Sequence, residues 1–400
     1  MTAGETRRRS SQAGRNGSGA IAERVLLGSL GLVAYTFLGY PAAVATLAKL
    51  WTRPPVLDPG YEPNVTLVVV AYNEEDVIAE KLENSRGLDY PSGRLELLVV
   101  ADGSDDETVE RARASGAARV LHEPVRRGKL AAMARAADAA TGEILVFSDA
   151  NNLYEPGTLR AVVAPFADPS VGVVSGRKVI DDGSGRGLDR AESLYWRYES
   201  ALKKWETATG SVAAVAGEII AFRRAAFRVP GHRFLVEDFV QAMLAALDGW
   251  RVVYAPDAVS VERASATVGD EATRRARIVS GRWQALVALL PRLLVRRPGL
   301  ALKVISHKGL RPLVPGALVL AALSNVASAR RGRASRLLLA GQAGFYAAAL
   351  AGYRNERAGR RNRLLFLAYY FCRMNFATLA GLHNFLRGRD AAVWAKVRRG

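Results

Sequence analysis

Three short apolar runs, separated by segments with helical spacing, constrain the fold of this 400-residue chain more than any other feature. The runs are nearly continuous in valine, leucine and isoleucine, as expected of buried parallel strands, and cover Val65–Ala71, Leu95–Ala101 and Ile144–Ser148. The segments between and after them are rich in helix formers and cover Glu74–Gly87, Ser104–Ala114 and Gly128–Ala140. This alternation predicts an α/β fold with a doubly wound, mostly parallel sheet, which binds ligands near the carboxyl ends of its strands.

Each predicted strand runs into polar residues at its carboxyl end. These segments are Tyr72-Asn73-Glu74-Glu75, Asp102-Gly103-Ser104-Asp105-Asp106 and Asp149-Ala150-Asn151-Asn152. Asp and Asn are common in turns and helix caps, so one such cluster alone indicates no site. Ser104 is itself predicted to cap the following helix, in a capping box with Glu107. Three clusters at three parallel strand ends converge on one crevice, and together they predict a binding site.

The oxygen-rich strand ends predict a site for a divalent cation. A cation at such a site in turn indicates a ligand that carries phosphate. Asp149 and Asn151 offer hard oxygen ligands, which suit Mg²⁺ or Mn²⁺ better than zinc. Such an ion would neutralise the charge that develops on a departing diphosphate. The basic run Arg126-Arg127-Gly128-Lys129 precedes a helix and offers further donors to the same phosphates. No P-loop and no GxGxxG fingerprint follows the first strand, which argues against P-loop NTPases and dinucleotide dehydrogenases.

The charge of the chain is unevenly distributed. Residues 61–269 carry 24 basic and 31 acidic side chains, whereas residues 270–400 carry 25 basic and 4 acidic ones. A basic segment of this kind indicates either nucleic acid or an anionic membrane surface. Its basic residues alternate with apolar runs of membrane length, and the chain has no nucleic-acid-binding motif. We therefore predict contact with membrane lipids and no nucleic-acid partner.

Apolar segments at both ends of the chain predict membrane helices. After a basic N-terminus predicted to be disordered (residues 1–24), 24 uncharged residues from Val25 to Ala48 predict a transmembrane segment over residues 25–51. The sheet is predicted to occupy residues 61–285, and residues 286–400 to form basic interfacial and transmembrane helices. The candidates there are an interfacial helix over Ala285–Lys303 and apolar segments over Pro312–Ala329, Leu337–Tyr353 and Leu364–Leu386. Basic residues flank these segments on both sides, so charge does not decide the topology.

Four segments in succession resemble the motifs of family-2 glycosyltransferases, over about residues 61–285. They read TLVVVAYNEE, LELLVVADGSDDET, RRGKLAAMARAADAATGEILVFSDANN and VEDFVQAMLAALDGWRVVYAPDA, and the later SHKGLRPLVP is similar to the membrane tails of polysaccharide-type members. The resemblance implies the GT-A fold and a nucleotide-diphosphate-sugar donor. It implies that Asn73 and Glu74 border the base, that Asp102 contacts the uracil or ribose, and that Lys129 lies near the phosphates.

The resemblance also implies the reacting groups. Asp149 and Asn151 occupy the DxD positions, which hold the metal and the diphosphate. Asp238, in the Glu237-Asp238 pair, matches the carboxylate that takes the proton from the acceptor hydroxyl. An acceptor hydroxyl has a pKa far above 7, so it needs such a base, and direct displacement with a single base inverts the anomeric centre. On the other hand, the pair would also suit the first turn of a helix predicted over Phe239–Leu247, where carboxylates complement the dipole.

The end of a QxxRW motif is matched by Arg282-Trp283, which the resemblance places at the acceptor or the diphosphate. Val279 stands where this motif has Gln, and Asn151 replaces the second carboxylate of DxD. These departures leave open a degenerate domain that only binds nucleotide sugar or scaffolds a membrane complex. Two further alternatives stay open. Trp196, in a helical segment over Leu188–Ala208, either packs in the core or borders the acceptor, and Glu218 either faces the acceptor or ends a buried salt bridge.

The sequence thus predicts a membrane-attached enzyme with its catalytic domain in the cytoplasm. It would transfer a sugar, with inversion, from a nucleotide-diphosphate sugar to a hydroxyl or lipid phosphate of a glycan or lipid-linked acceptor. Its product would belong to cell-surface polysaccharide or glycolipid synthesis.

Overall fold

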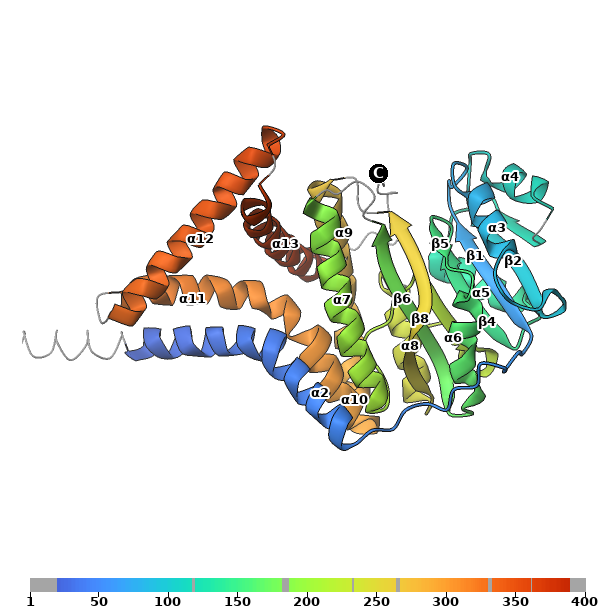
Figure 1. Ribbon diagram of the computed structural model, residues 1–400, viewed down its shortest axis with the longest axis horizontal. Helices are drawn as coiled ribbons and strands as arrows, with labels where there is room; N and C mark the ends of the chain where they lie inside the picture. The colour runs from blue at the N-terminus through green and yellow to red at the C-terminus, as the bar shows by residue number, and fades with distance from the viewer. Residues whose placement is uncertain are drawn as a thin grey trace, which may run out of the picture.

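The computed structural model describes residues 20–116, 119–181, 187–231, 234–263, 267–329, 333–360 and 362–388, and its centre is one eight-stranded sheet (Figure 1). The strands are β1 (Val65–Ala71), β2 (Leu95–Asp102), β3 (Arg119–Glu123), β4 (Ile144–Asp149), β5 (Asn152–Tyr154), β6 (Val171–Asp181), β7 (Ile219–Arg223) and β8 (Arg251–Arg263). Their order is β3-β2-β1-β4-β7-β6-β8-β5, and β7 and β5 run antiparallel to their neighbours. The other strands share one direction, which confirms the predicted mostly parallel α/β fold.

The sheet is buried on both faces, which explains its nearly continuous apolar strands. In β1, Val68 faces one core, while Leu67 and Val69 face the other. Helices α5 (Lys129–Ala139), α8 (Glu237–Leu247) and α9 (Val268–Arg296) cover the first face. Helices α3 (Ile78–Arg86), α4 (Thr108–Ala114) and α6 (Thr158–Val163) cover the second. Each fully buried aliphatic side chain contributes about 1.5–3 kcal/mol, so this packing holds the strand ends in place.

The predicted strands and helices are found, with differences at helix starts. Helix α7 (Gly187–Ala208) and α5 begin within one residue of the prediction, whereas α3 and α4 each begin four residues late. The predicted capping box is wrong. The hydroxyl of Ser104 accepts a hydrogen bond from the backbone N–H of Asn73, and the first turn of α4 is capped by Asp106, which accepts from Thr108 N at 3.0 Å. Ser104 is thus used to join β1 to β2.

Within the described residues, four helices are long and apolar enough to cross a membrane by length and composition: Ala20–Leu50, Val268–Arg296, Pro298–Ser328 and Arg363–Leu386. The second of these, α9, also covers the sheet, and it runs without a break through residue 285. The others expose large apolar side chains such as Leu38, Leu323 and Phe376. They include α2 (Tyr40–Leu50), α10 (Pro298–Val304), α11 (Val314–Ser328) and α13 (Arg363–Leu386); α11 and α12 (Arg333–Arg357) extend from the side of the molecule opposite β1–β3 (Figure 1). Of the predicted disordered N-terminus, residues 1–19 lie outside the described residues, and residues 20–24 are helical.

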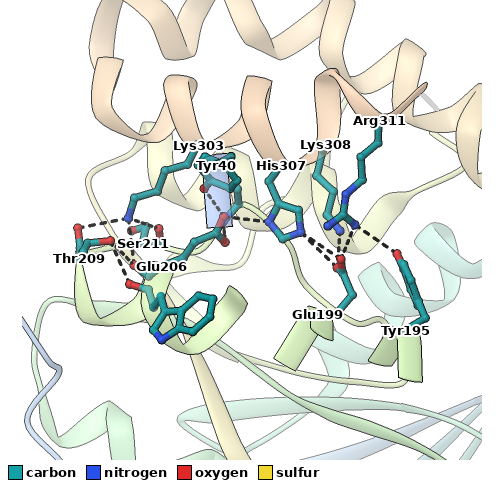
Figure 2. Close-up of polar contacts among 12 residues, drawn as sticks. Tyr40, Tyr195, Glu199, Glu206, Thr209, Ser211, Lys303, His307, Lys308 and Arg311 are labelled. Atoms are coloured by element: carbon teal, nitrogen blue, oxygen red, sulfur yellow. Dashed lines mark hydrogen bonds and ion pairs between the residues drawn. The ribbon is translucent and has the colours of Figure 1, made fainter. Parts of the chain in front are cut away.

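Buried ionic contacts join this helical part to α7 (Figure 2). Glu206 accepts hydrogen bonds from the hydroxyl of Tyr40, at 2.5 Å, and contacts Nδ1 of His307, at 2.8 Å. The next residue of the helical tail is Lys308, whose Nζ lies 2.8 Å from Glu199, and Glu199 also pairs with Arg311. The π-helical turn η5 (Ile305–Gly309), part of the SHKGLRP segment, therefore docks on α7 through charge. This docking fixes the helical tail against the sheet.

We predict that Gly381→Ala destabilises the protein by about 1–3 kcal/mol, the usual cost of overpacking. A Cβ atom at Gly381, on α13, would clash with the backbone of Ala276 and lie 2.8 Å from the Cβ of Val279, both on α9. The measurement is thermal unfolding in neutral detergent. Gly341→Ala on α12 is the control, because nothing lies within 4 Å of its new methyl group. Equal melting temperatures for Gly381→Ala and the wild type would contradict the α9–α13 contact.

Candidate functional site

A pocket of about 220 Å³ lies between β4, α7, α8 and α9. Five of the predicted site residues line it: Lys129, Asp149, Glu237, Asp238 and Arg282. They come from four different elements, β4, α5, α8 and α9, and meet because α5, α8 and α9 all pack on the same face of the sheet. The other predicted site residues, Asn73, Glu74, Asp102, Asn151 and Trp283, lie outside its lining.

Lys129 joins two of the acidic groups in the pocket. Its Nζ lies 2.7 Å from Oδ1 of Asp149, at the end of β4, and 3.5 Å from Oε1 of Glu237, at the start of α8. Burial lowers the pKa of Lys129, but the Asp149 and Glu237 carboxylates outweigh it and raise the pKa above its ordinary value. The lysine is therefore cationic and offsets the repulsion between carboxylates that the fold brings together.

The loop before Lys129 is held by Asp102. The Asp102 carboxylate accepts hydrogen bonds from the backbone N–H groups of Arg127 and Gly128, at 3.1 and 2.5 Å, and from Arg135 at 2.9 Å. Gly128 has a φ of 94°, a left-handed conformation that suits glycine and starts α5 directly after the turn. Asp102 therefore positions Lys129 through the loop, and its predicted contact with the nucleotide stays a prediction.

Asp238 has the acid–base properties of a general base. It lies in the first turn of α8, in contact with Gly217, where an added Cβ would stand 3.1 Å from its Oδ2. Burial and the neighbouring Glu237 raise the pKa of Asp238 to about 7. A carboxyl with this pKa accepts a proton far more readily than an ordinary aspartate while still being half ionised near neutral pH.

Asn73 and Glu74 form a bridge between the ends of β1 and β2. Asn73 Nδ2 donates to Asp105 at 2.6 Å, and the N–H of Glu74 donates to the hydroxyl of Thr108 at 2.7 Å. Asn73 has a φ of 53°, which few residues other than glycine and asparagine adopt. Beside this bridge, the guanidinium of Arg126 stacks 3.5 Å above the ring of Tyr72. A flat cationic surface of this kind suits a nucleotide base.

Asn151 has a free oxygen suited to a cation. Its Oδ1 is buried and has no hydrogen-bond partner among the described residues, two positions after Asp149. Buried amide oxygens are rarely left unpaired, so this atom fits a metal ligand. Within the described part of the chain, no group of three His, Cys, Asp or Glu could hold a metal alone. One carboxylate and one amide match a Mg²⁺- or Mn²⁺-type ion that is completed by substrate phosphates.

The two residues of the predicted RW pair are separated by the structure. Arg282 faces the pocket, whereas Trp283 stacks on Phe385 of α13 with ring centroids 6.3 Å apart. Consecutive helical residues point in different directions, so only one of the pair can face the pocket. Trp283 packs between α9 and α13 in this structure.

Several pocket residues were missed or left undecided by the sequence. Trp196, given as core or acceptor site, lines the pocket. Glu218 forms one of its two expected contacts, a buried salt bridge in which its Oε1 lies 2.6 Å from Lys178. Glu218 also lines the pocket, and its contact with an acceptor stays a prediction. The pocket residues missed altogether include Tyr195, Glu199, Arg274, Arg275, Arg277 and Lys308. The only available signal was the dense run of arginines that opens α9.

Comparison with known proteins identifies the family. The model described as "Glycosyltransferase like family 2" matches residues 63–284, more than half of the chain. The chain belongs to glycosyltransferase family 2. Its sheet and helices have the GT-A fold of this family, as the solved relatives show.

Relatives of this family-2 chain include proteins of known name. It is 27% identical over 202 residues to the beta-monoglucosyldiacylglycerol synthase of Trichormus variabilis, covering 48% of this chain and 43% of that one. It is 24% identical over 231 residues to the poly-beta-1,6-N-acetyl-D-glucosamine synthase of Staphylococcus aureus, covering 56% and 55%. The chain thus spans about half the length of the curated relatives it matches.

One solved structure resembles nearly the whole chain. It is a mannosyltransferase from Pyrobaculum calidifontis in complex with GDP-Man and Mn²⁺, with a TM-score of 0.68 and 28% sequence identity. The match covers 91% of this chain and 99% of that one, so it extends over the helical tail as well as the sheet.

The raised pKa of Asp238 predicts a pH-dependent stability. An unfolded aspartate has a pKa of about 3.9, so the folded protein binds the extra proton between about pH 4 and pH 7 and loses stability as the pH rises through this range. Asparagine at this position cannot ionise. We expect Asp238→Asn to melt close to the wild type at pH 4 and higher by on the order of a few degrees at pH 8. Thermal unfolding at both pH values tests this, and a difference that does not change with pH would contradict it.

Proposed function

We propose that this chain transfers a sugar, with inversion, from a nucleotide-diphosphate sugar to a hydroxyl of a membrane-associated acceptor. The observation that carries the proposal is the single cluster of Lys129, Asp149, Glu237 and Asp238 in a pocket at the carboxyl end of β4. This cluster combines a base of suitable pKa with a cation that suits phosphates. Family membership and the nucleotide-sugar complex of the Pyrobaculum mannosyltransferase support the same reaction class.

In the proposed mechanism, Asp238 takes the proton of the acceptor hydroxyl. The hydroxyl oxygen forms a bond to the anomeric carbon as the bond from that carbon to the diphosphate breaks, on the opposite side of the sugar. The single displacement inverts the anomeric centre, and the proton stays on Asp238 until it passes to water. Glu237 lies beside Asp238 and raises its pKa, so it acts through the base.

The donor would lie along the ends of β1, β2 and β4. We place the base at Asn73, Glu74 and the Tyr72–Arg126 stack, and the diphosphate at Lys129. A divalent cation, Mg²⁺ or Mn²⁺, would be held by Asp149 and Asn151 and would stabilise the negative charge of the leaving nucleoside diphosphate. Lys129 would supply a second positive charge there, and this combination compensates for the missing second carboxylate of DxD.

The acceptor would reach the pocket from the membrane side. Its lining includes Lys308 of η5 and Tyr370 of α13, which belong to helices long and apolar enough to span a membrane. Names of the curated relatives include a glycolipid synthase and a polysaccharide synthase. We therefore propose a lipid-linked or glycan acceptor at the cell membrane, with the sheet on the cytoplasmic side, where nucleotide sugars are made.

We expect Asp238→Asn to lower kcat by at least about a thousandfold, because the acceptor hydroxyl loses its base. The amide is almost the same size and leaves the donor site intact, so the Kd of the donor should stay within about twofold. Transfer and donor binding are measured on full-length protein in detergent, with UDP-, GDP- and TDP-sugars and Mn²⁺.

Asp248→Asn is the matched control, since Asp248 ends the same helix and its carboxylate pairs on the surface with Arg228, its one ionic partner among the described residues. Its kcat should equal that of the wild type. If Asp238→Asn transferred sugar at the wild-type rate, Asp238 would not be the base. A wild type that binds donor and never transfers or hydrolyses it would favour a degenerate domain that serves as a scaffold.

A further inference from the structure

The pocket has a second, cationic arm away from Asp238. This arm, called here the arginine arm, is lined by Tyr195 and Glu199 of α7, Arg275 and Arg282 of α9, and Lys308 of η5. Arg275 and Arg282 are seven residues apart, two helical turns, and so lie on the same side of α9. Arg275 also stacks on Tyr195, with its guanidinium 5.5 Å from the ring centroid.

The two arginines of this arm have no counter-ion among the described residues. Three other cations of the pocket are paired: Lys129 with Asp149, Arg274 with Glu271 at 2.8 Å, and Lys308 with Glu199 at 2.8 Å. Among the described residues, Arg275 and Arg282 form neither an ion pair nor a hydrogen bond. Two half-buried guanidinium groups without an acceptor leave their N–H donors available to a ligand.

The nearby carboxylate cannot neutralise them. Glu199 is already in contact with three groups of the helical tail: His307 Nε2 at 3.2 Å, Lys308 at 2.8 Å, and Arg311 (Figure 2). Its single negative charge is outnumbered by the charges of Lys308 and Arg311 alone. The arm therefore carries an excess of positive charge and attracts an anion.

The anion is distinct from the donor diphosphate. Arg277 interacts electrostatically with Glu237 and Asp149, which places it at the donor end of the pocket. Arg282 interacts instead with Tyr195, Arg311, Glu199 and Arg275. The arginine arm is thus distinct from the cluster at which the diphosphate is proposed to lie, and its lining includes Lys308 of the apolar tail.

We propose that Arg275 and Arg282 bind a phosphate that the acceptor carries in addition to the hydroxyl that receives the sugar, and that this phosphate is the phosphodiester headgroup of a membrane lipid. Guanidinium groups bind phosphate oxygens with paired hydrogen bonds, and membranes present phosphates at the level of their headgroups. The lipid source follows from the surroundings, because α9, η5 and α13 all belong to candidate membrane spans. This inference rests on the proposed transfer reaction and specifies its acceptor class.

The test measures, by calorimetry, the binding of dihexanoylphosphatidylglycerol to full-length protein in neutral detergent. Dihexanoylglycerol, which has the same chains and a hydroxyl but no phosphate, should bind at least about tenfold more weakly, because each charge-assisted hydrogen bond is lost with the phosphate. Arg275→Gln and Arg282→Gln should each weaken phosphatidylglycerol binding by at least about tenfold. Arg292→Gln, on the exposed side of the same helix, should leave it within about twofold.

Arg275→Lys and Arg282→Lys retain the charge and should bind better than the glutamine variants, which separates loss of binding from loss of folding. Equal binding of the two dihexanoyl lipids, or wild-type affinity in Arg275→Gln, would overturn the proposal. If glycerol 3-phosphate binds as tightly as phosphatidylglycerol, the anion is a soluble phosphate and the lipid assignment is wrong. Binding is measured without donor, so a protein that binds the lipid but transfers no sugar would contradict the proposed function and leave this inference standing.

Discussion

The contact of Lys129 with Asp149 and Glu237 is the interaction on which the rest of the site depends. It joins the end of β4 to the start of α8 and places one buried ammonium among three carboxylates, those of Asp149, Glu237 and Asp238. Without that charge, the carboxylates would repel each other in a poorly solvated pocket, where such repulsion is strong. The position of the lysine depends in turn on Asp102, which holds the backbone of the preceding loop. A structural carboxylate at the end of β2 therefore supports the chemistry at the end of β4.

A second buried charge cluster has a different role. On α7, Glu206 contacts Tyr40 of the N-terminal apolar helix and His307 of the tail (Figure 2). Glu199, on the same helix, contacts His307, Lys308 and Arg311 of the tail. Helix α7 therefore connects the sheet to both apolar parts of the chain. Buried ion pairs contribute little net stability but tolerate few alternative partners. They thus fix the position of the apolar helices against α7, which lines the pocket. The agreement over 91% of the chain with the Pyrobaculum mannosyltransferase includes this arrangement of sheet and tail.

The sequence predicted those parts of the site that are formed by residues close to one another along the chain. Strands β1, β2 and β4 were recognisable because burial on both faces requires continuous apolar runs, and Asp149 and Asp238 follow directly from strand and helix ends. The interaction of Ser104 with Asn73 was not recognisable, because it joins two loops 31 residues apart and replaces the helix cap that local spacing predicts. Glu218 shows the same limit: as a polar residue that interrupts an apolar run, it suited either a buried salt bridge or the acceptor site. Only the three-dimensional structure shows that it pairs with Lys178 and lines the pocket.

The residues at the acceptor end of the pocket are the most widely separated along the sequence. They lie on α7, α9, η5 and α13, across more than 170 positions of the chain, and no short motif unites them. Arg292 and Arg296 of α9 fall in the segment predicted to lie on the membrane surface and are exposed, whereas Arg275 and Arg282, earlier in the same helix, line the pocket. Charge patterns alone do not distinguish these situations, since both require arginine at helical spacing.

The stereochemistry of the first transferred sugar tests the central claim most directly, because it reports whether one base acts in a single displacement. The product from an α-linked nucleotide-diphosphate sugar is analysed by proton NMR in the early phase of the reaction, before any rearrangement. A single displacement assisted by one base predicts a β-linked product. An α-linked product would mean a retaining reaction, and it would contradict the role given to Asp238 and to the cluster around Lys129.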